Sequence, residues 1–133
     1  MKRRLRRGDY GDLNIYYLAS PANDTLGYSA YPLYNVQTDA DEFYDDGCVV
    51  LASTVPGGSQ EGYDLGRTTT HEVGHWFGLF HTFENGCDAP GDNVNDTPPQ
   101  KEATKGCPAV AANSCPDSPG VDGIHNFMDY SFE

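Results

Sequence analysis

The segment HEVGHWFGLFH, residues 71–81, constrains the fold more than any other part of the chain. His71 and His75 are four residues apart, so on a helix their side chains project about 40° from one another on one face. Both imidazoles can then reach a single metal ion, and Glu72 on the adjoining side can reach a water bound to it. We therefore predict a helix from about Arg67 to Gly78.

Gly78 determines how a third ligand can reach the same ion. If the helix continued, His81 would lie too far along its axis to share a metal with His71. A glycine with positive φ lets the chain turn sharply and bring His81 back. Three neutral histidines leave one coordination position open, as in a catalytic zinc site. The sequence therefore predicts zinc held by His71, His75 and His81.

The chemistry expected of this arrangement is hydrolysis. Zinc lowers the pKa of a bound water to about 7, and Glu72 can take its proton as the water attacks a carbonyl. A core helix with incidental histidines is the competing interpretation, but it would bury these polar groups without partners at a high cost. We predict a zinc-dependent endopeptidase with Glu72 as general base, although the motif alone does not exclude another amide as substrate.

Charge and hydropathy narrow the class of partner. Five of the eight basic residues lie in the first seven positions, which leaves three basic and 20 acidic residues, a formal charge of −17. A chain with this negative charge after its first seven residues repels phosphate backbones, so no nucleic-acid partner is expected. No stretch approaches the roughly 20 apolar residues of a membrane helix. We expect a monomer that acts on protein or peptide substrates.

The basic residues at the start of the chain resemble the first part of a signal peptide. No apolar region follows them, because Asp9, Asp12 and Asn14 interrupt it. We therefore expect no signal peptide in this chain, and interpret residues 1–7 as the exposed end of a helix that begins upstream or has been lost.

Three segments before the helix have strand character. Residues 13–19 are rich in β-formers, residues 26–31 are a weaker candidate, and residues 48–54 are apolar enough for a strand buried on both faces. Residues 39–46 contain five acids and predict a solvated loop, with a calcium site as the alternative. In the helix itself, threonines near the start are candidate caps. Its apolar surface is expected from Val73, Trp76, Phe77 and Leu79.

From residue 82 to residue 125 regular structure is not expected, because six of the nine prolines lie there. Cys87, Cys107 and Cys115 also lie in this region and suggest disulfides, and hence an oxidising compartment. A second zinc site is disfavoured because no C-x-x-C pair is present. Sequons at Asn23 and Asn95 are compatible with a secreted, extracellular protein.

The sequence NFMDY, residues 126–130, follows the histidine motif and, together with GHWFGLFHTF and GCDAPGDNVNDTPP, carries a family resemblance. The chain resembles the metzincin clan of zinc metalloproteases, and within it the secreted, fungal-like branch of the pappalysin-type family. The resemblance implies an α+β fold, with a twisted mixed sheet, an active-site helix and a loop-rich, disulfide-stapled lower half. It covers nearly the whole chain.

The resemblance also implies roles for single residues. Met128 would pack beneath the metal ligands without binding the metal, and Tyr130 would be catalytic, either binding zinc or donating a hydrogen bond to the oxyanion. Calcium would bind near residues 92–97, with a polar turn as the alternative. His125 matches no family role and is expected to be a loop histidine.

By the same resemblance Cys87 pairs with Cys115, and the residue matching Cys107 pairs with a cysteine beyond residue 133. Here Cys107 would be unpaired or would pair with Cys48. We expect a single, truncated catalytic domain with an upper part at residues 1–78 and a lower part at residues 79–133. The alternative is a truncated, catalytically impaired zinc-binding relative that acts as a binding module.

Overall fold

The structure, a computed structural model, describes residues 1–21 and 25–132. The predicted sequon at Asn23 lies outside the described residues. The chain forms two compact units, Met1–Gly78 and Leu79–Glu133. No helix in the described part of the chain is long and apolar enough to cross a membrane.

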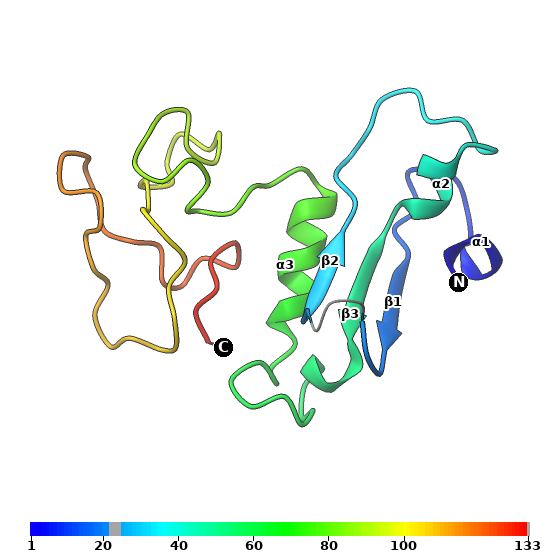
Figure 1. Cartoon of the computed structure of the whole chain (residues 1–133), viewed down its shortest axis with the longest axis horizontal. Coiled ribbons are helices and arrows are strands. Elements are labelled where there is room, and N and C mark those ends of the chain that lie inside the picture. Colours follow the sequence, from blue (N-terminus) through cyan, green and yellow to red (C-terminus); the bar gives the residue numbers. More distant parts are fainter. Residues whose placement is uncertain (22–24, 133) are drawn as a thin grey trace. The chain divides into compact units, whose positions relative to one another are not determined.

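The first unit is built on a mixed three-stranded sheet (Figure 1). Its order is β1 (Ile15–Leu18), β3 (Cys48–Leu51) and β2 (Gly27–Ser29), with β1 parallel and β2 antiparallel to β3. The first three residues of β3 are fully buried, as expected for a central strand. A short 3-10 turn (η2, Ala52–Thr54) follows it. All three predicted strands are confirmed, each shorter than its sequence pattern.

Helix α3 (Arg67–Trp76) packs against β2 and β3 and confirms the predicted helix (Figure 1). Two details of the prediction are wrong. Gly66, with φ +88°, occupies the N-cap and no side chain caps the helix, so the threonines do not serve as caps. The buried residues of α3 are Thr68, Glu72 and His75, whereas Phe77 just after it is 70% exposed.

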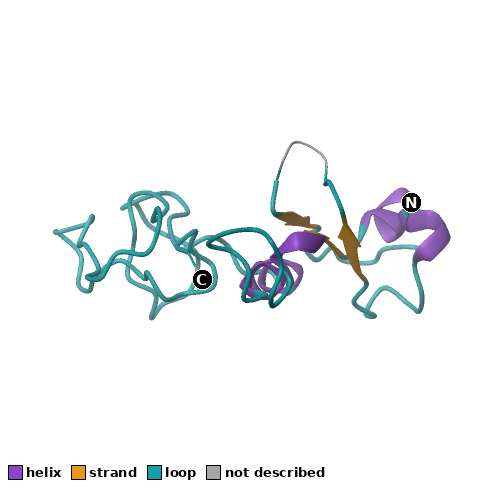
Figure 2. Cartoon of the chain, turned by 90° about the horizontal axis from the view of Figure 1, so that it is seen from below, coloured by secondary structure: helices purple, strands orange, loops and turns teal. Residues whose placement is uncertain are grey.

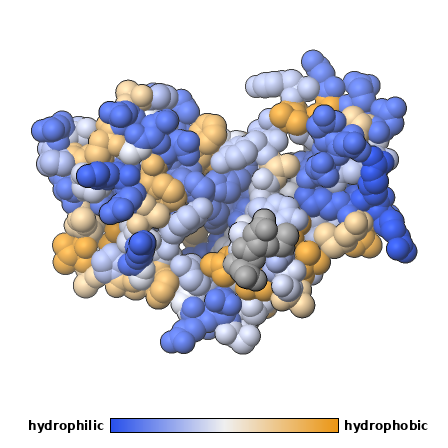
Figure 3. All heavy atoms as spheres, in the orientation of Figure 1, coloured by the Kyte–Doolittle hydropathy of each residue, from blue (hydrophilic) through white to orange (hydrophobic). Residues whose placement is uncertain are grey.

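The acidic segment at residues 39–46 is not a solvated loop. It contains helix α2 (Asp41–Asp45), whose Phe43 is buried, and it ends at Asp46, which is 2% exposed. A buried aromatic residue among acids anchors the segment to the core, and the acid count alone did not show this. The surface over α1 and α2 is nevertheless largely hydrophilic in the space-filling view (Figure 3).

The basic N-terminus forms the short helix α1 (Lys2–Leu5), but it is not wholly exposed. Arg6 is buried and its Nη1 donates to Asp46 Oδ2 at 2.7 Å. The guanidinium also lies 4.4 Å from the centre of the Phe43 ring. Asp46 Oδ1 accepts from Trp76 Nε1 at 2.8 Å, so one buried carboxylate joins the N-terminus to the last residue of α3.

The second unit has neither helix nor strand among residues 79–132, as predicted (Figure 2). One disulfide joins Cys87 to Cys115, which agrees with the pairing implied by the family resemblance. Cys107 is exposed and free, and Cys48 is buried and free, so the alternative Cys48–Cys107 pair is not formed.

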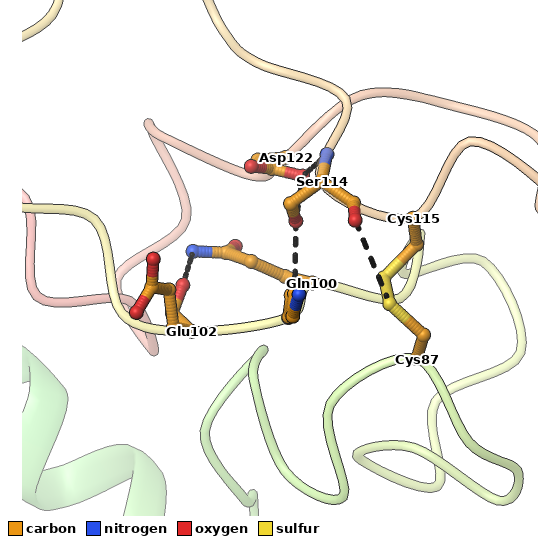
Figure 4. Close-up of a disulfide and its surroundings, with 7 residues drawn as sticks. Cys87, Gln100, Glu102, Ser114, Cys115 and Asp122 are labelled. Carbon is orange, nitrogen blue, oxygen red and sulfur yellow. Dashed lines mark hydrogen bonds between the residues drawn. A yellow bond between two sulfur atoms is a disulfide. The ribbon is translucent and has the colours of Figure 1, made fainter.

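A fully buried amide organises the loops around the disulfide (Figure 4). Gln100 Oε1 accepts from the Thr82 hydroxyl at 3.0 Å and from the Gly123 N–H at 3.2 Å. Its Nε2 donates to the Glu102 carbonyl and to Asp129 Oδ1, each at 3.0 Å. Buried polar groups are stable only when hydrogen-bonded, and Gln100 meets this requirement by linking segments that are far apart in sequence.

Candidate metal centre

Two imidazoles meet on the surface of α3. The Nε2 atoms of His71 and His75 are 3.0 Å apart, and the ring planes are at 89°. His75 is 7% exposed. Two ring nitrogens at this distance need a proton or a cation between them, because otherwise their lone pairs repel. The four-residue spacing therefore brings the pair together as predicted.

Glu72 lies between the two histidines in sequence and is 5% exposed. Burial raises the pKa of its carboxyl from 4.5 to about 7, against a smaller lowering by the Ser29 hydroxyl. Its Oε2 is buried and has no hydrogen-bond partner among the described residues. Two convergent imidazoles, on the same helix as a buried carboxylate with an unsatisfied oxygen, are a donor set that fits a zinc ion carrying a water.

Gly78 ends the helix in the predicted way. Its φ is +94°, a conformation that a residue with a Cβ rarely adopts, and its N–H donates to the His75 carbonyl at 2.8 Å. A Cβ at this position would also lie 3.4 Å from Pro32. The backbone therefore leaves the helix direction three residues before His81.

His81 lies within a cluster of aromatic rings in the second unit. Its ring stacks on Phe83 with centroids 4.7 Å apart and planes at 7°. The ring of Tyr130 meets it edge-on at 4.8 Å. The next residue, Thr82, donates its N–H to the carbonyl of buried Met128 at 3.2 Å. The resemblance singled out Met128 and Tyr130. Tyr130 contacts His81, the third histidine of the motif, and Met128 contacts Thr82, the residue after it.

The candidate calcium segment forms a polar turn. Asp92 is buried and its Oδ1 accepts from the Val94 N–H at 3.0 Å. Asp88, Asp92 and Thr97 are among the residues that line a pocket in this part of the second unit. Calcium binding here stays a prediction. His125 is exposed and outside any helix or strand.

Two residues that the sequence did not single out contact the candidate site. Ser29 Oγ donates to the backbone carbonyl of Glu72 at 2.7 Å. The Tyr31 hydroxyl lies 3.1 Å from His75 Nδ1. Neither residue belongs to a motif. Ser29 and Tyr31 are two positions apart, in and just after strand β2, so on an extended chain their side chains point to the same side.

Comparison with known proteins settles the family. The family model Peptidase M43, described as pregnancy-associated plasma protein-A, matches residues 56–132. The chain belongs to this family. The predicted pappalysin-type resemblance is thereby confirmed, and membership of a metallopeptidase family implies a metal.

The relatives include fungal proteins named extracellular metalloproteases. One from Colletotrichum graminicola is 53% identical over the whole chain, which covers 46% of that protein. Extracellular metalloprotease 1 from Coccidioides posadasii is 55% identical, again over the whole chain and 47% of the relative. The chain therefore spans about half the length of the curated relatives it matches.

A solved structure, mature mirolysin of Tannerella forsythia in complex with a cleaved peptide, is similar with a TM-score of 0.73 and 36% identity. The similarity covers 94% of this chain and 46% of mirolysin. Together with the mixed sheet and helix α3 of the first unit, this similarity confirms the predicted α+β, metzincin-type class.

Proposed function

We propose that this chain carries the catalytic zinc site of an extracellular metalloendopeptidase, with zinc held by His71, His75 and His81. The observation that carries the proposal is the meeting of the His71 and His75 Nε2 atoms at 3.0 Å, on a helix whose buried Glu72 lies between them in the sequence. The three histidines are a candidate ligand set for one metal ion. Three neutral imidazoles suit zinc and leave a position for water and substrate.

Glu72 is the proposed general base. Bound zinc would supply a Lewis acid that polarises the scissile carbonyl and acidifies a water. Glu72 accepts the proton of the attacking water and returns it to the leaving amine.

Tyr130 is the proposed donor to the oxyanion. Its ring packs edge-on against His81, and the residue is 46% exposed. A phenol that donates a hydrogen bond to the developing negative charge lowers the barrier more than it strengthens substrate binding. Coordination of zinc by the same hydroxyl is the alternative role.

The proposed substrates are proteins or peptides in the extracellular space. The complex of mirolysin with a cleaved peptide and the names of the fungal relatives support this class. The acidic composition supports the absence of a nucleic-acid partner. Calcium near residues 92–97 is a secondary part of the proposal, supported by the buried carboxylate of Asp92.

Cleavage of unfolded casein by the 133-residue chain, with zinc content measured on the same sample, tests the proposal. We expect one zinc per chain, cleavage that stops on addition of a chelator, and loss of cleavage without loss of zinc in Glu72→Ala. Stoichiometric zinc without cleavage would favour the alternative, a zinc-binding relative that acts as a binding module. A chain that binds no zinc would contradict both.

A further inference from the structure

Strand β2 and the residues that follow it present one face to α3. Alternate residues of an extended chain point to the same side, so Gly27, Ser29 and Tyr31 share a face. Each of the three meets the helix at a residue of the candidate site. By contrast Tyr28, on the opposite face, is 44% exposed.

Gly27 allows a close approach of strand and helix. A Cβ on Gly27 would lie 2.7 Å from Glu72 Oε1 and 2.8 Å from its Cγ, closer than such atoms can come. The φ of Gly27 is not in the left-handed region, so the space and not the backbone conformation requires glycine. The hydrogen bond from Ser29 Oγ to the Glu72 carbonyl then fixes the register between the two elements.

This register brings the hydroxyl of Tyr31 to 3.1 Å from His75 Nδ1, the ring nitrogen opposite the one that faces His71. The two rings are 5.3 Å apart, with planes at 61°. When the Nε2 of a histidine binds a metal, its Nδ1 carries the proton and needs an acceptor. The phenol oxygen of Tyr31 is placed to accept it.

We propose that Tyr31 is a positioning residue that holds His75 in the orientation and tautomer needed to bind zinc through Nε2. The inference rests on the proposed function, because it assumes that His75 is a ligand. Loss of such a supporting hydrogen bond typically weakens metal binding by about 10- to 100-fold. Tyr31 would therefore act on affinity for the metal without touching the metal or the substrate.

Tyr17 supplies a matched control. Its hydroxyl also lies 3.1 Å from a side chain of α3, the Thr69 hydroxyl, and it is 47% exposed against 39% for Tyr31. Tyr17→Phe and Tyr31→Phe thus each remove one hydroxyl that contacts the same helix. Only the second hydroxyl contacts a candidate ligand.

The test is competition between the chain and a zinc chelator of known affinity, with thermal unfolding of the metal-free proteins as a second measurement. We expect Tyr31→Phe to bind zinc about 10- to 100-fold more weakly than the wild type, and Tyr17→Phe to bind it equally well. Both metal-free variants should unfold within a few degrees of each other. In zinc-loaded protein, the His75 Nδ1–H resonance should move upfield in Tyr31→Phe alone.

Equal zinc affinity of Tyr31→Phe and the wild type would overturn the inference and leave the zinc site intact. Equal losses of affinity in both tyrosine variants would also overturn it, since they would reflect the stability of α3 and not the orientation of His75. Failure of the wild-type chain to bind zinc would instead overturn the proposed function on which the inference rests.

Discussion

The two units of the chain use different means to hold their folds. The first, residues 1–78, has a mixed sheet, a packed helix and a buried Arg6–Asp46 ion pair. The second has no regular secondary structure among residues 79–132 and depends on the Cys87–Cys115 disulfide and a buried polar network centred on Gln100.

The difference shows how the residues of the candidate site are held in position in each unit. His71, Glu72 and His75 are spaced by the geometry of a helix, which itself is held against a sheet. His81 lies instead on a loop, next to a residue tied by its N–H to Met128 and by its side chain to Gln100. We therefore expect the two units to respond to different perturbations.

Removal of the Asp46 carboxylate should cause the largest loss of stability. Both side chains of the Arg6–Asp46 pair are 2% exposed, so Asp46→Ala leaves a buried cation without its partner and Trp76 Nε1 without its acceptor. We expect a loss of about 3–5 kcal/mol in the free energy of unfolding, measured with urea. Asp41→Ala, which breaks the exposed pair with Arg3, should cost less than about 1 kcal/mol. Similar costs for the two variants would contradict the account of the first unit.

Loss of the disulfide should affect mainly the second unit. A bridge that spans 28 residues stabilises by about 3 kcal/mol through the entropy of the unfolded chain. The double change of Cys87 and Cys115 to Ser should therefore abolish hydrogen-exchange protection in residues 79–132 while protection of the sheet persists. Cys107→Ser, at an exposed free thiol, should change neither. Equal loss of protection in both units after the double change would refute this division.

Substitution of Gln100 should have a smaller effect in the same unit. Gln100→Leu leaves the Thr82 hydroxyl and the Gly123 N–H without their acceptor, and Asp129 Oδ1 with only the Thr104 N–H as donor. We expect a cost of about 1–3 kcal/mol in urea unfolding. Gln37→Leu, at an exposed position, is the control and should be close to neutral. A neutral Gln100→Leu would show that the network does not organise the loops.

A pH dependence, at most about 1.4 kcal/mol per pH unit for one proton, should be confined to the first unit. The pKa of Glu72 is raised from 4.5 to about 7 in the folded protein, so between these values the folded state binds a proton that the unfolded chain has lost. The free energy of unfolding of the metal-free protein should therefore fall as pH rises through this window. Glu72→Gln should remove that contribution, and an identical pH profile for the two proteins would contradict the assigned burial of the carboxyl.

The sequence predicted what depends on local spacing. The three strands, α3 and the sharp turn at Gly78 follow from hydrophobic pattern, the position of glycine and the four-residue repeat of histidines. It also predicted the irregular second unit, because prolines and turn residues exclude helices and strands from it. The metal-ligand roles of the three histidines, and the roles of Glu72 and Tyr130, stay proposals.

The sequence did not predict what depends on contacts between distant residues. The sequence around Asp46 predicts a solvated loop, because nothing near it shows that Arg6, 40 positions away, is buried with it. Tyr31 contacts His75 across 44 positions through the pairing of a strand and a helix. The Gln100 network likewise depends on loops whose paths have no periodic signal. Long-range polar contacts of this kind can be identified only once the fold is known.

Zinc titration of the metal-free chain, followed calorimetrically, tests the central claim most directly. We expect one site per chain in the wild type, the same stoichiometry in Glu72→Ala, and loss of the site in His75→Ala. Zinc binding of unchanged stoichiometry and affinity in His75→Ala would contradict the central claim, because the metal would then be held elsewhere.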